Sequence, residues 1–258
     1  MASRFGPGDW WQSLYDDIVA ELFMVRRDAR ENSRTAWFLI HTLGLDPGST
    51  AFDQCCGIGT LSLPLAENGV RVVGVDQSAE YVRRASEAAA ARGLPCQFHA
   101  ADAFTFTSPT PCDAALNWNT GFGNAADDDR NRQMLCRAFE SLKPGSRFLL
   151  DYQHVARVLR QFQHTLSYRL ATPAGEVLLL REGEADLAAG ALRQRWTFVL
   201  PDGTRRERHS LVRLYLPHEL ARLLAEAGFE EVEFLGGIDG EPLELDSPRC
   251  IALARRPA

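Results

Sequence analysis

The chain has 258 residues, of which 45% are hydrophobic and 24% charged, a composition typical of one folded domain that carries an insertion. Its net charge of −6 and pI of about 5.6 predict that nucleic acid is not its partner, because such a partner calls for a basic stripe. No apolar stretch approaches the roughly 20 residues that cross a bilayer, and the N-terminus has no apolar signal segment, so we expect a cytoplasmic protein without a membrane partner.

The first 48 residues predict an N-terminal helical cap. Apolar residues recur at three- and four-residue steps between Leu14 and Val25, and a second helix is expected over about residues 33–43. Three arginines lie on the first of these helices: Arg26, Arg27 and Arg30. They form either a solvated helix face or a contact to an anion near a cofactor.

Strands and helices alternate from residue 49 to residue 152. Helices are expected over about residues 60–67, 79–92 and 127–142, and a Lys-Pro-Gly-Ser turn precedes the fifth strand. The five expected strands are, in order, TAFDQC, RVVGVD, CQFHAA, DAALNW and RFLLDY. Strands that alternate with helices of this length predict βαβ units and a parallel sheet with buried strands.

The pattern changes after residue 152. A helix over about residues 154–162 precedes four segments with period-two alternation, LSYRLA, EVLLLREGEAD, ALRQRWTFVL and RRERHSLVRLYL. Such alternation, with an Asp-Gly turn, indicates antiparallel hairpins. We therefore predict a β-rich lid over residues 153–215, inserted into a main domain formed by residues 49–152 and 216–258. The lid offers a surface for a homodimer, and its charges form a solvated face or attract an acidic acceptor. These charges are Arg193, Arg195 and the basic run 205–208.

Metal-site spacing is absent from the sequence. The six cysteines form no CxxC pair, and the six histidines form no HExxH motif. We therefore expect reduced, buried thiols and no metal.

Four polar segments follow the first four predicted strands, at the edge where open α/β sheets bind ligands. Residues 53–59 carry two glycines, which allow backbone to approach a ligand closely. Asp76 lies about 20 residues after the first of these glycines, a distance typical of an acid that binds ribose hydroxyls. Asp102 follows the third strand, where a carboxylate and an adjacent amide can bind adenine. Residues 117–123 add two asparagines, whose amides need partners when buried. Each segment alone also fits a plain turn or a capping residue.

Together the four segments resemble the motifs of the class I S-adenosylmethionine-dependent methyltransferases. FDQCCGIG is similar to their glycine-rich first motif, VVGVDQS to the acidic second, AADAF to the adenine-contacting third and DAALNWNTGFG to the fourth. LKPGSRFLLDY resembles their fifth strand with its preceding turn. The resemblance covers about residues 10–152 and, more loosely, the last two strands. It implies an α/β, Rossmann-like sheet of seven strands in the order 3-2-1-4-5-7-6, with the seventh strand antiparallel and helices on both faces. Gln54 and Cys56 depart from the pattern, which leaves a modified pocket open.

The resemblance implies S-adenosylmethionine as the cofactor and assigns its contacts. The methionine part would lie against the glycine turn, the ribose at Asp76 and the adenine at Asp102. The cofactor-binding residues implied in this way are Tyr15, Asp53, Cys55, Gly57, Gly59, Asp76, Gln77, Asp102, Ala103 and Asn117.

Methyl transfer to a small-molecule acceptor, at an N, O or C atom, is the function that follows. The reaction is an in-line displacement at a sulfonium carbon, so the protein mainly aligns the acceptor with the methyl group. A base is needed only if the acceptor arrives protonated. The candidate catalytic residues are Tyr15, Asn119 and His154, and further candidates on the acceptor side are Trp118, Asp151 and Tyr152. Trp10 and Trp11 either wall an acceptor pocket or pack the first helix against the domain.

Three alternatives stay open at this point. A nicotinamide-dependent oxidoreductase would need a third glycine, but Ser62 stands at that position of GxGxxG. A non-catalytic module would use the Rossmann-like domain for binding alone. A third class of protein would use S-adenosylmethionine for another displacement, such as a cyclisation.

Overall fold

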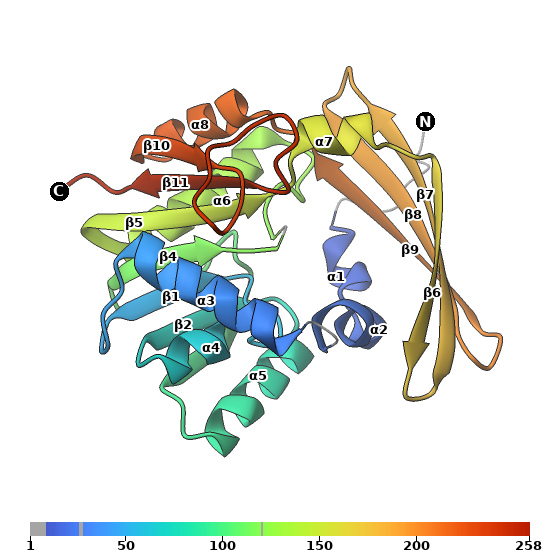
Figure 1. Cartoon of the computed structure of the whole chain (residues 1–258), viewed down its shortest axis with the longest axis horizontal. Helices are drawn as coiled ribbons and strands as arrows, with labels where there is room; N and C mark the ends of the chain where they lie inside the picture. The colour runs from blue at the N-terminus through green and yellow to red at the C-terminus, as the bar shows by residue number, and fades with distance from the viewer. Residues whose placement is uncertain (1–8, 26–27, 120) are drawn as a thin grey trace.

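The computed structural model describes residues 9–25, 28–119 and 121–258. Within these ranges, seven strands form one sheet and four strands form a second. Figure 1 shows the two sheets on opposite sides of the short N-terminal helices. The strands of the larger sheet are β1 (Thr50–Gln54), β2 (Arg71–Asp76), β3 (Cys96–Ala100), β4 (Cys112–Asn117), β5 (Leu142–Tyr152), β10 (Glu230–Leu235) and β11 (Cys250–Arg255).

The larger sheet has the order β3-β2-β1-β4-β5-β11-β10. Strands β1 to β5 are parallel, and β11 runs antiparallel to both β5 and β10. Since β10 and β11 are the sixth and seventh strands of the main domain, the predicted order and the antiparallel last strand are confirmed. The predicted Lys-Pro-Gly-Ser turn lies inside β5, where the pairing with β4 shifts register between Cys112 and Ala114.

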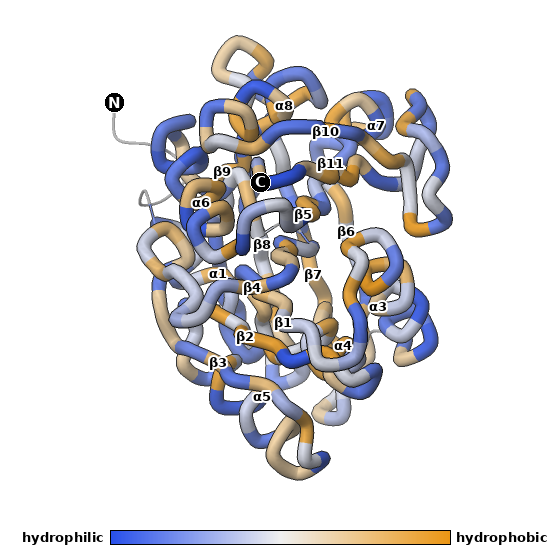
Figure 2. Tube along the Cα trace, turned by 90° about the vertical axis from the view of Figure 1, so that its left-hand side faces the viewer, coloured by the Kyte–Doolittle hydropathy of each residue, from blue (hydrophilic) through white to orange (hydrophobic). Residues whose placement is uncertain are grey.

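Helices cover both faces of this sheet because each buried strand presents apolar residues on both sides. Ala51 contributes to the core beneath one set of helices, and its neighbour Phe52 contributes to the core on the opposite face. In Figure 2 helices α3 and α6 carry both polar and apolar colours, as expected for helices with one buried face. Contacts place α3 (Ala29–Leu43), α4 (Ser62–Glu67) and α5 (Ala79–Ala91) in one row, and α6 (Asp128–Ser141) and α8 (Pro217–Glu226) in another.

The N-terminal segment is broken where one helix was expected. It forms α1 (Trp11–Leu14), α2 (Asp17–Ala20) and a π-helical turn, η1 (Glu21–Val25). The break occurs because the Asp16 carboxylate accepts hydrogen bonds from the amides of Ile18 and Val19 and so begins a new helix. Helix α3 begins at Ala29, earlier than predicted, and is capped by Asp28.

The predicted arginine cluster is only partly visible. Arg26 and Arg27 lie outside the described residues. Arg30 lies on α3, where it is exposed, and not on the first helix as expected.

The four-stranded sheet is an antiparallel meander in the order β6-β7-β8-β9. It follows helix α7 (Val155–Arg160), and its strands coincide with the four alternating segments of the sequence. They are β6 (Thr165–Thr172), β7 (Gly175–Asp186), β8 (Ala191–Val199) and β9 (Arg205–Arg213). Across the ranges that the structure covers, none of the helices combines the length and apolar character that crossing a bilayer requires.

Candidate functional site

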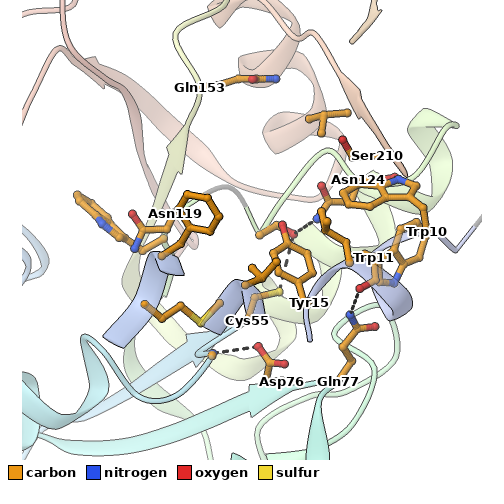
Figure 3. A pocket seen from close by; sticks show the side chains of 18 of the residues that line it. Trp10, Trp11, Tyr15, Cys55, Asp76, Gln77, Asn119, Asn124, Gln153 and Ser210 are labelled. Carbon is orange, nitrogen blue, oxygen red and sulfur yellow. Dashed lines mark hydrogen bonds between the residues drawn. The ribbon is translucent and has the colours of Figure 1, made fainter. Parts of the chain in front are cut away.

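A cavity of about 580 Å³ lies where the carboxyl ends of β1, β2 and β4 face the N-terminal helices and the four-stranded sheet. Its volume is in the range of small-molecule and cofactor sites. Figure 3 shows Asp76, Gln77 and Cys55 on one side of this space and Gln153 and Ser210 on the opposite side, with Tyr15 and Asn119 between them. The predicted site residues that line the cavity are Tyr15, Asp53, Cys55, Gly57, Asp76, Gln77, Asp102, Ala103 and Asn119.

The turn after β1 is held directly by the acid at the end of β2. Cys55 and Gly57 both adopt positive φ, 65° and 58°, so the chain reverses tightly at the sheet edge. The Gly57 amide donates to Asp76 Oδ2 at 2.9 Å, and the Ser78 amide donates to Oδ1 at 2.9 Å. Burial raises the pKa of Asp76, while these two amides favour its ionised form. The glycine turn and the ribose-binding candidate are therefore one hydrogen-bonded unit.

Asp53 is the most deeply buried carboxylate of the cavity wall, with 3% of its surface exposed. The Ser62 hydroxyl donates a hydrogen bond to it. The pKa of Asp53 is raised to about 7. Burial is the largest cause; the hydrogen bond from Ser62 lowers the pKa, and the nearby Asp76 carboxylate raises it. The carboxyl group therefore titrates near neutral pH, where a bound cation would favour its ionised form.

The adenine-side candidates extend the same wall. Asp102 is exposed and its Oδ1 accepts from the Phe104 amide at 2.8 Å, while Ala103 is buried. Gln77 donates from Nε2 to the Trp11 carbonyl at 2.9 Å, which joins the end of β2 to the N-terminal helices. Trp11 therefore lines the cavity next to the acidic edge.

Two predicted cofactor residues do not line the cavity. Gly59 packs against the sheet-covering helices, since an added Cβ would lie 3.3 Å from Ala85 Cβ. Asn117 is fully buried and donates to Gln54 Oε1 at 3.1 Å, and Gln54 in turn donates to the Met134 carbonyl at 3.0 Å. Gln54 departs from the family pattern, and its buried side-chain amide is hydrogen-bonded at both ends, to Asn117 and to the Met134 carbonyl.

The loop after β4 fits closely around the turn after β1. A Cβ on Gly121 would lie 2.7 Å from Asn117 Oδ1 and 2.8 Å from Cys55 Cβ, so only glycine fits there. Asn119 adopts a positive φ of 59°, and its amide donates to Asp151 Oδ2 at 3.0 Å. Asp151 also forms an ion pair with Arg249 at 2.9 Å. This network fixes the backbone that carries Asn119 at the cavity wall.

His154 lies outside the cavity. Its side chain is buried, and Nε2 donates to the Glu244 carbonyl at 2.8 Å. The sequence placed His154 just beyond β5, but the chain turns into α7 at this point and directs the imidazole toward the loop before β11. Tyr152 is also buried away from the cavity, with its hydroxyl donating to the Arg213 carbonyl. Trp10, Trp11 and Trp118 do line the cavity.

The inner face of the four-stranded sheet supplies cavity residues that sequence reasoning missed. They are Arg181 of β7, Leu192, Gln194 and Trp196 of β8, and Ser210 and Val212 of β9. Period-two alternation groups them on one face, but it does not say which face meets the cavity. Among the residues that the structure covers, no group of three His, Cys, Asp or Glu side chains is arranged for a metal.

The residues at the sheet edge fit S-adenosylmethionine. Gly57 lines the cavity, and a Cβ added there would meet Met24 Sδ at 3.4 Å, so the turn and the Met24 side chain lie against each other at the cavity wall. Asn117 Oδ1 is buried without a hydrogen-bond partner among the described residues, directly behind that turn. Buried carboxylates, a glycine turn and an adjacent aromatic wall are groups that suit a cationic, ribose-bearing ligand.

Comparison with known proteins concerns the domain and its fold. Residues 51–145 match a family model described as a methyltransferase domain. A solved S-adenosylmethionine-dependent methyltransferase from Clostridium acetobutylicum superposes with a TM-score of 0.77 at 17% identity, covering 93% of this chain and 97% of that one. The S-adenosylmethionine-bound CalS10, an amino pentose methyltransferase from Micromonospora echinaspora, has a TM-score of 0.69 at 17% identity, with coverage of 94% and 98%.

The class of protein follows from the domain match and the fold. Residues 51–145 form a methyltransferase domain, and the chain has the fold of the class I S-adenosylmethionine-dependent methyltransferases. The predicted superfamily and fold are confirmed. At the level of this domain, the predicted enzyme class and S-adenosylmethionine as its cofactor are confirmed as well.

The prediction about partners is wrong where it excludes nucleic acid. A protein from Aromatoleum aromaticum named 23S rRNA (uracil(1939)-C(5))-methyltransferase RlmD is 46% identical over 109 residues. The match spans 42% of this chain and only 22% of that protein. Net charge fails as a criterion because it averages over the whole surface, whereas a partner contacts only part of it. The acceptor is not fixed by these relatives.

Proposed function

We propose that the chain transfers the methyl group of S-adenosylmethionine to a small-molecule acceptor held between the two sheets. One observation carries this proposal: a single cavity joins the acidic edge of the larger sheet to the inner face of the four-stranded sheet. A small acceptor can be enclosed there, beside the cofactor motifs. The similarity in fold to an amino pentose methyltransferase over nearly the whole chain supports the same assignment.

The roles of individual residues follow their places in the cavity. Asp76 and Gln77 would hold the ribose, and Asp102 with Ala103 the adenine. Asp53, Cys55 and Gly57 would surround the methionine part. The positive charge of the cofactor there would favour the ionised form of Asp53. Gly59 and Asn117 would act indirectly, by fixing the conformation of the turn.

Methyl transfer requires mainly that the protein align the acceptor atom with the methyl group. When bound, the cofactor supplies an electrophilic methyl group on a sulfonium that is already a good leaving group. Tyr15 and Asn119 lie between the two walls, so they are the residues proposed to orient the acceptor and exclude water. His154, which points elsewhere, is given no part in the reaction.

Calorimetric titration with S-adenosylmethionine, S-adenosylhomocysteine and NAD tests the cofactor. We expect binding of the first two and none of NAD, and tight binding of NAD alone would overturn the proposal. Mass spectrometry of products then tests the acceptor, with amino sugars and other small molecules in one arm and total RNA in the other. An increase of one methyl group on a small molecule supports the proposal. Methylated RNA with no small-molecule product, or a product without an added methyl group, would contradict it.

A further inference from the structure

The inner face of the four-stranded sheet carries one cation into the cavity. In the antiparallel register Arg181 pairs with Trp196, and Gln194 pairs with Ser210, so these four side chains lie on the same face. All four line the cavity. Arg181 belongs to β7, which lies between β6 and β8 (Figure 1).

The surroundings of Arg181 are polar and aromatic but contain no counter-ion. Its Nη2 donates to Gln194 Oε1 at 3.0 Å, and the guanidinium carbon lies 4.1 Å from the centre of the Trp196 ring. The Tyr168 hydroxyl is a further neighbour. The Nε atom is buried and has no hydrogen-bond partner within the described ranges. None of the carboxylates in those ranges forms an ion pair with Arg181.

Other arginines of the same sheet are neutralised. Arg193 forms an ion pair with Asp186 at 2.7 Å, and Arg195 forms one with Glu182 at 2.6 Å. Arg208, on the inner face beside the N-terminal helices, is paired with Asp16 at 3.1 Å. These three arginines therefore have carboxylate partners, from the sheet or from the N-terminal segment, whereas Arg181 has none among the described residues.

Arg181 is half-buried, and a partly desolvated cation without a counter-ion gains most from a ligand that supplies the opposite charge. Burial lowers the pKa of Arg181, but an arginine side chain stays protonated in proteins. Its planar fork matches the two oxygens of a carboxylate or phosphate. Gln194 and Ser210 place an amide and a hydroxyl beside it, both able to donate to the same group.

We propose that the methyl acceptor carries an oxyanion, a carboxylate or a phosphate monoester, which binds Arg181 at the four-stranded sheet. The inference rests on the proposed function, since it describes the acceptor of that reaction. The anion would anchor the acceptor at the wall opposite the cofactor motifs and leave its nucleophilic atom directed toward the sheet edge. The sequence left open whether Arg193, Arg195 and the run 205–208 form a solvated face or attract an acidic acceptor. Arg193 and Arg195 lie on the other face and are already paired.

The test measures anion binding next to Trp196. The full chain is labelled with 5-fluorotryptophan, saturated with S-adenosylhomocysteine and titrated with benzoate, phenyl phosphate and the uncharged isostere benzamide. The Trp196 fluorine signal is assigned with Trp196→Phe. Variants Arg181→Gln and Arg181→Lys are compared with Arg195→Gln, which removes an equal charge from the opposite face of the same sheet.

We expect at least one of the two anions to shift the Trp196 signal and benzamide to bind more weakly. Arg181→Gln should weaken anion binding about tenfold or more, Arg181→Lys should retain part of it, and Arg195→Gln should leave it unchanged. Which anion binds more tightly distinguishes a carboxylate from a phosphate. Failure of both anions to bind the wild-type protein, or equal binding by wild type and Arg181→Gln, would refute the inference.

A separate titration with S-adenosylhomocysteine keeps the two proposals apart. We expect wild type and Arg181→Gln to bind it equally. Weaker binding by Arg181→Gln would show that the guanidinium holds the carboxylate of the cofactor, which overturns the inference and leaves the proposed function standing. No binding by the wild type would instead contradict the proposed function. Thermal unfolding of each variant checks that the fold is retained.

Discussion

The carboxyl edge of the seven-stranded sheet and the inner face of the four-stranded sheet line one cavity, yet they bring polar groups to it by different routes. At the edge, the acids are strand-end residues whose backbone neighbours hold them, as the Gly57 and Ser78 amides hold Asp76. On the inner face, polar residues stand among apolar ones at alternate positions, as Gln194 stands between Leu192 and Trp196.

The difference in charge is equally clear. The edge contributes carboxylates, with Asp53, Asp76 and Asp102 in the cavity wall, whereas the inner face contributes the guanidinium of Arg181. An edge of this kind suits a cationic cofactor, and the inner face suits an acceptor with the opposite charge. The proposed cofactor contacts therefore lie at the ends of the parallel strands, and the proposed acceptor contact lies on the appended sheet.

The largest expected effect concerns the pH dependence that the edge imposes on stability. Because the folded-state pKa of Asp53 is about 7, against 3.8 as its ordinary value, the folded state keeps a proton that the unfolded chain releases. The free energy of unfolding should therefore fall by up to about 4 kcal/mol as pH rises from about 4 to about 7. Above that pH it should level off. Denaturant unfolding of wild type and Asp53→Asn at each pH measures this, and the variant should lose most of the slope, with the raised pKa of Asp76 accounting for the remainder.

Asp113→Asn is the control for that measurement. Asp113 lies near the amino end of β4, where the Thr50 amide and the Lys143 ammonium hold its pKa below the ordinary value against a partial desolvation. Its contribution to stability is complete above about pH 4 and is lost only at lower pH. The difference between wild type and Asp113→Asn should be constant from pH 5 to pH 8. A slope that survives unchanged in Asp53→Asn would show that another group causes it.

The second effect tests how tightly the edge is packed. Gly121→Ala should lower the free energy of unfolding by about 3 kcal/mol, because the new Cβ meets Asn117 Oδ1 and Cys55 Cβ well inside contact distance. It should also weaken S-adenosylmethionine binding by displacing the turn after β1. Gly183→Ala, in the four-stranded sheet, is the matched control, since the added Cβ would lie 3.5 Å from the Phe162 ring, at ordinary contact distance. If both variants behave alike, the close fit at Gly121 does not matter.

The third prediction concerns the acid that holds the turn. Asp76→Ala removes the acceptor of two backbone amides and the proposed partner of the ribose, so S-adenosylmethionine binding should weaken by about 2 kcal/mol, or roughly 30-fold. Calorimetry measures the loss, and the fold should largely survive. Asp113→Ala, at the opposite end of the sheet, should bind the cofactor as the wild type does. Unchanged affinity in Asp76→Ala would make the ribose assignment wrong.

The smallest effect concerns the junction between the two walls. Arg208 of β9 donates from Nε to the Ser13 carbonyl at 2.8 Å and is paired with Asp16. Arg208→Gln should cost below about 1 kcal/mol of stability, since the pair is partly exposed and screened by salt. Thermal unfolding at low and high salt should show the wild-type advantage shrinking as salt rises. Arg206→Gln serves as the control, and an equal effect there would mean that net charge, not this contact, is responsible.

The parallel strands and the glycine turn could be predicted from the chain because they depend on local rules, whereas the full strand order followed from the resemblance of the motifs to a known family. Alternating strands and helices with buried strands allow few topologies, and acids at the ends of neighbouring parallel strands meet at one edge. The prediction for β1 to β5 and the convergence of Asp53, Asp76 and Asp102 on one cavity have this origin. The period-two pattern similarly predicted the strands of the second sheet.

Three features needed the tertiary structure. The chain breaks at Asp16 because a carboxylate competes for backbone amides, although the apolar stripe continues through it. His154 bonds to a carbonyl 90 residues away, and Gly59 packs against Ala85, so neither faces the cavity that its position in the chain suggested.

The amino-acid sequence by itself determined the alternating strands and helices and the acidic edge, because hydrophobic periodicity and strand-end position act over a few residues, and its motifs implied the strand order through their resemblance to a known family. Only the tertiary structure decided which face of the four-stranded sheet closes the cavity, and therefore that Arg181 lies inside while Arg193 and Arg195 lie outside. The alternation along a strand determines which residues share a face, but it does not determine what each face contacts. That depends on the orientation of one sheet over the other, which is set by contacts between distant segments.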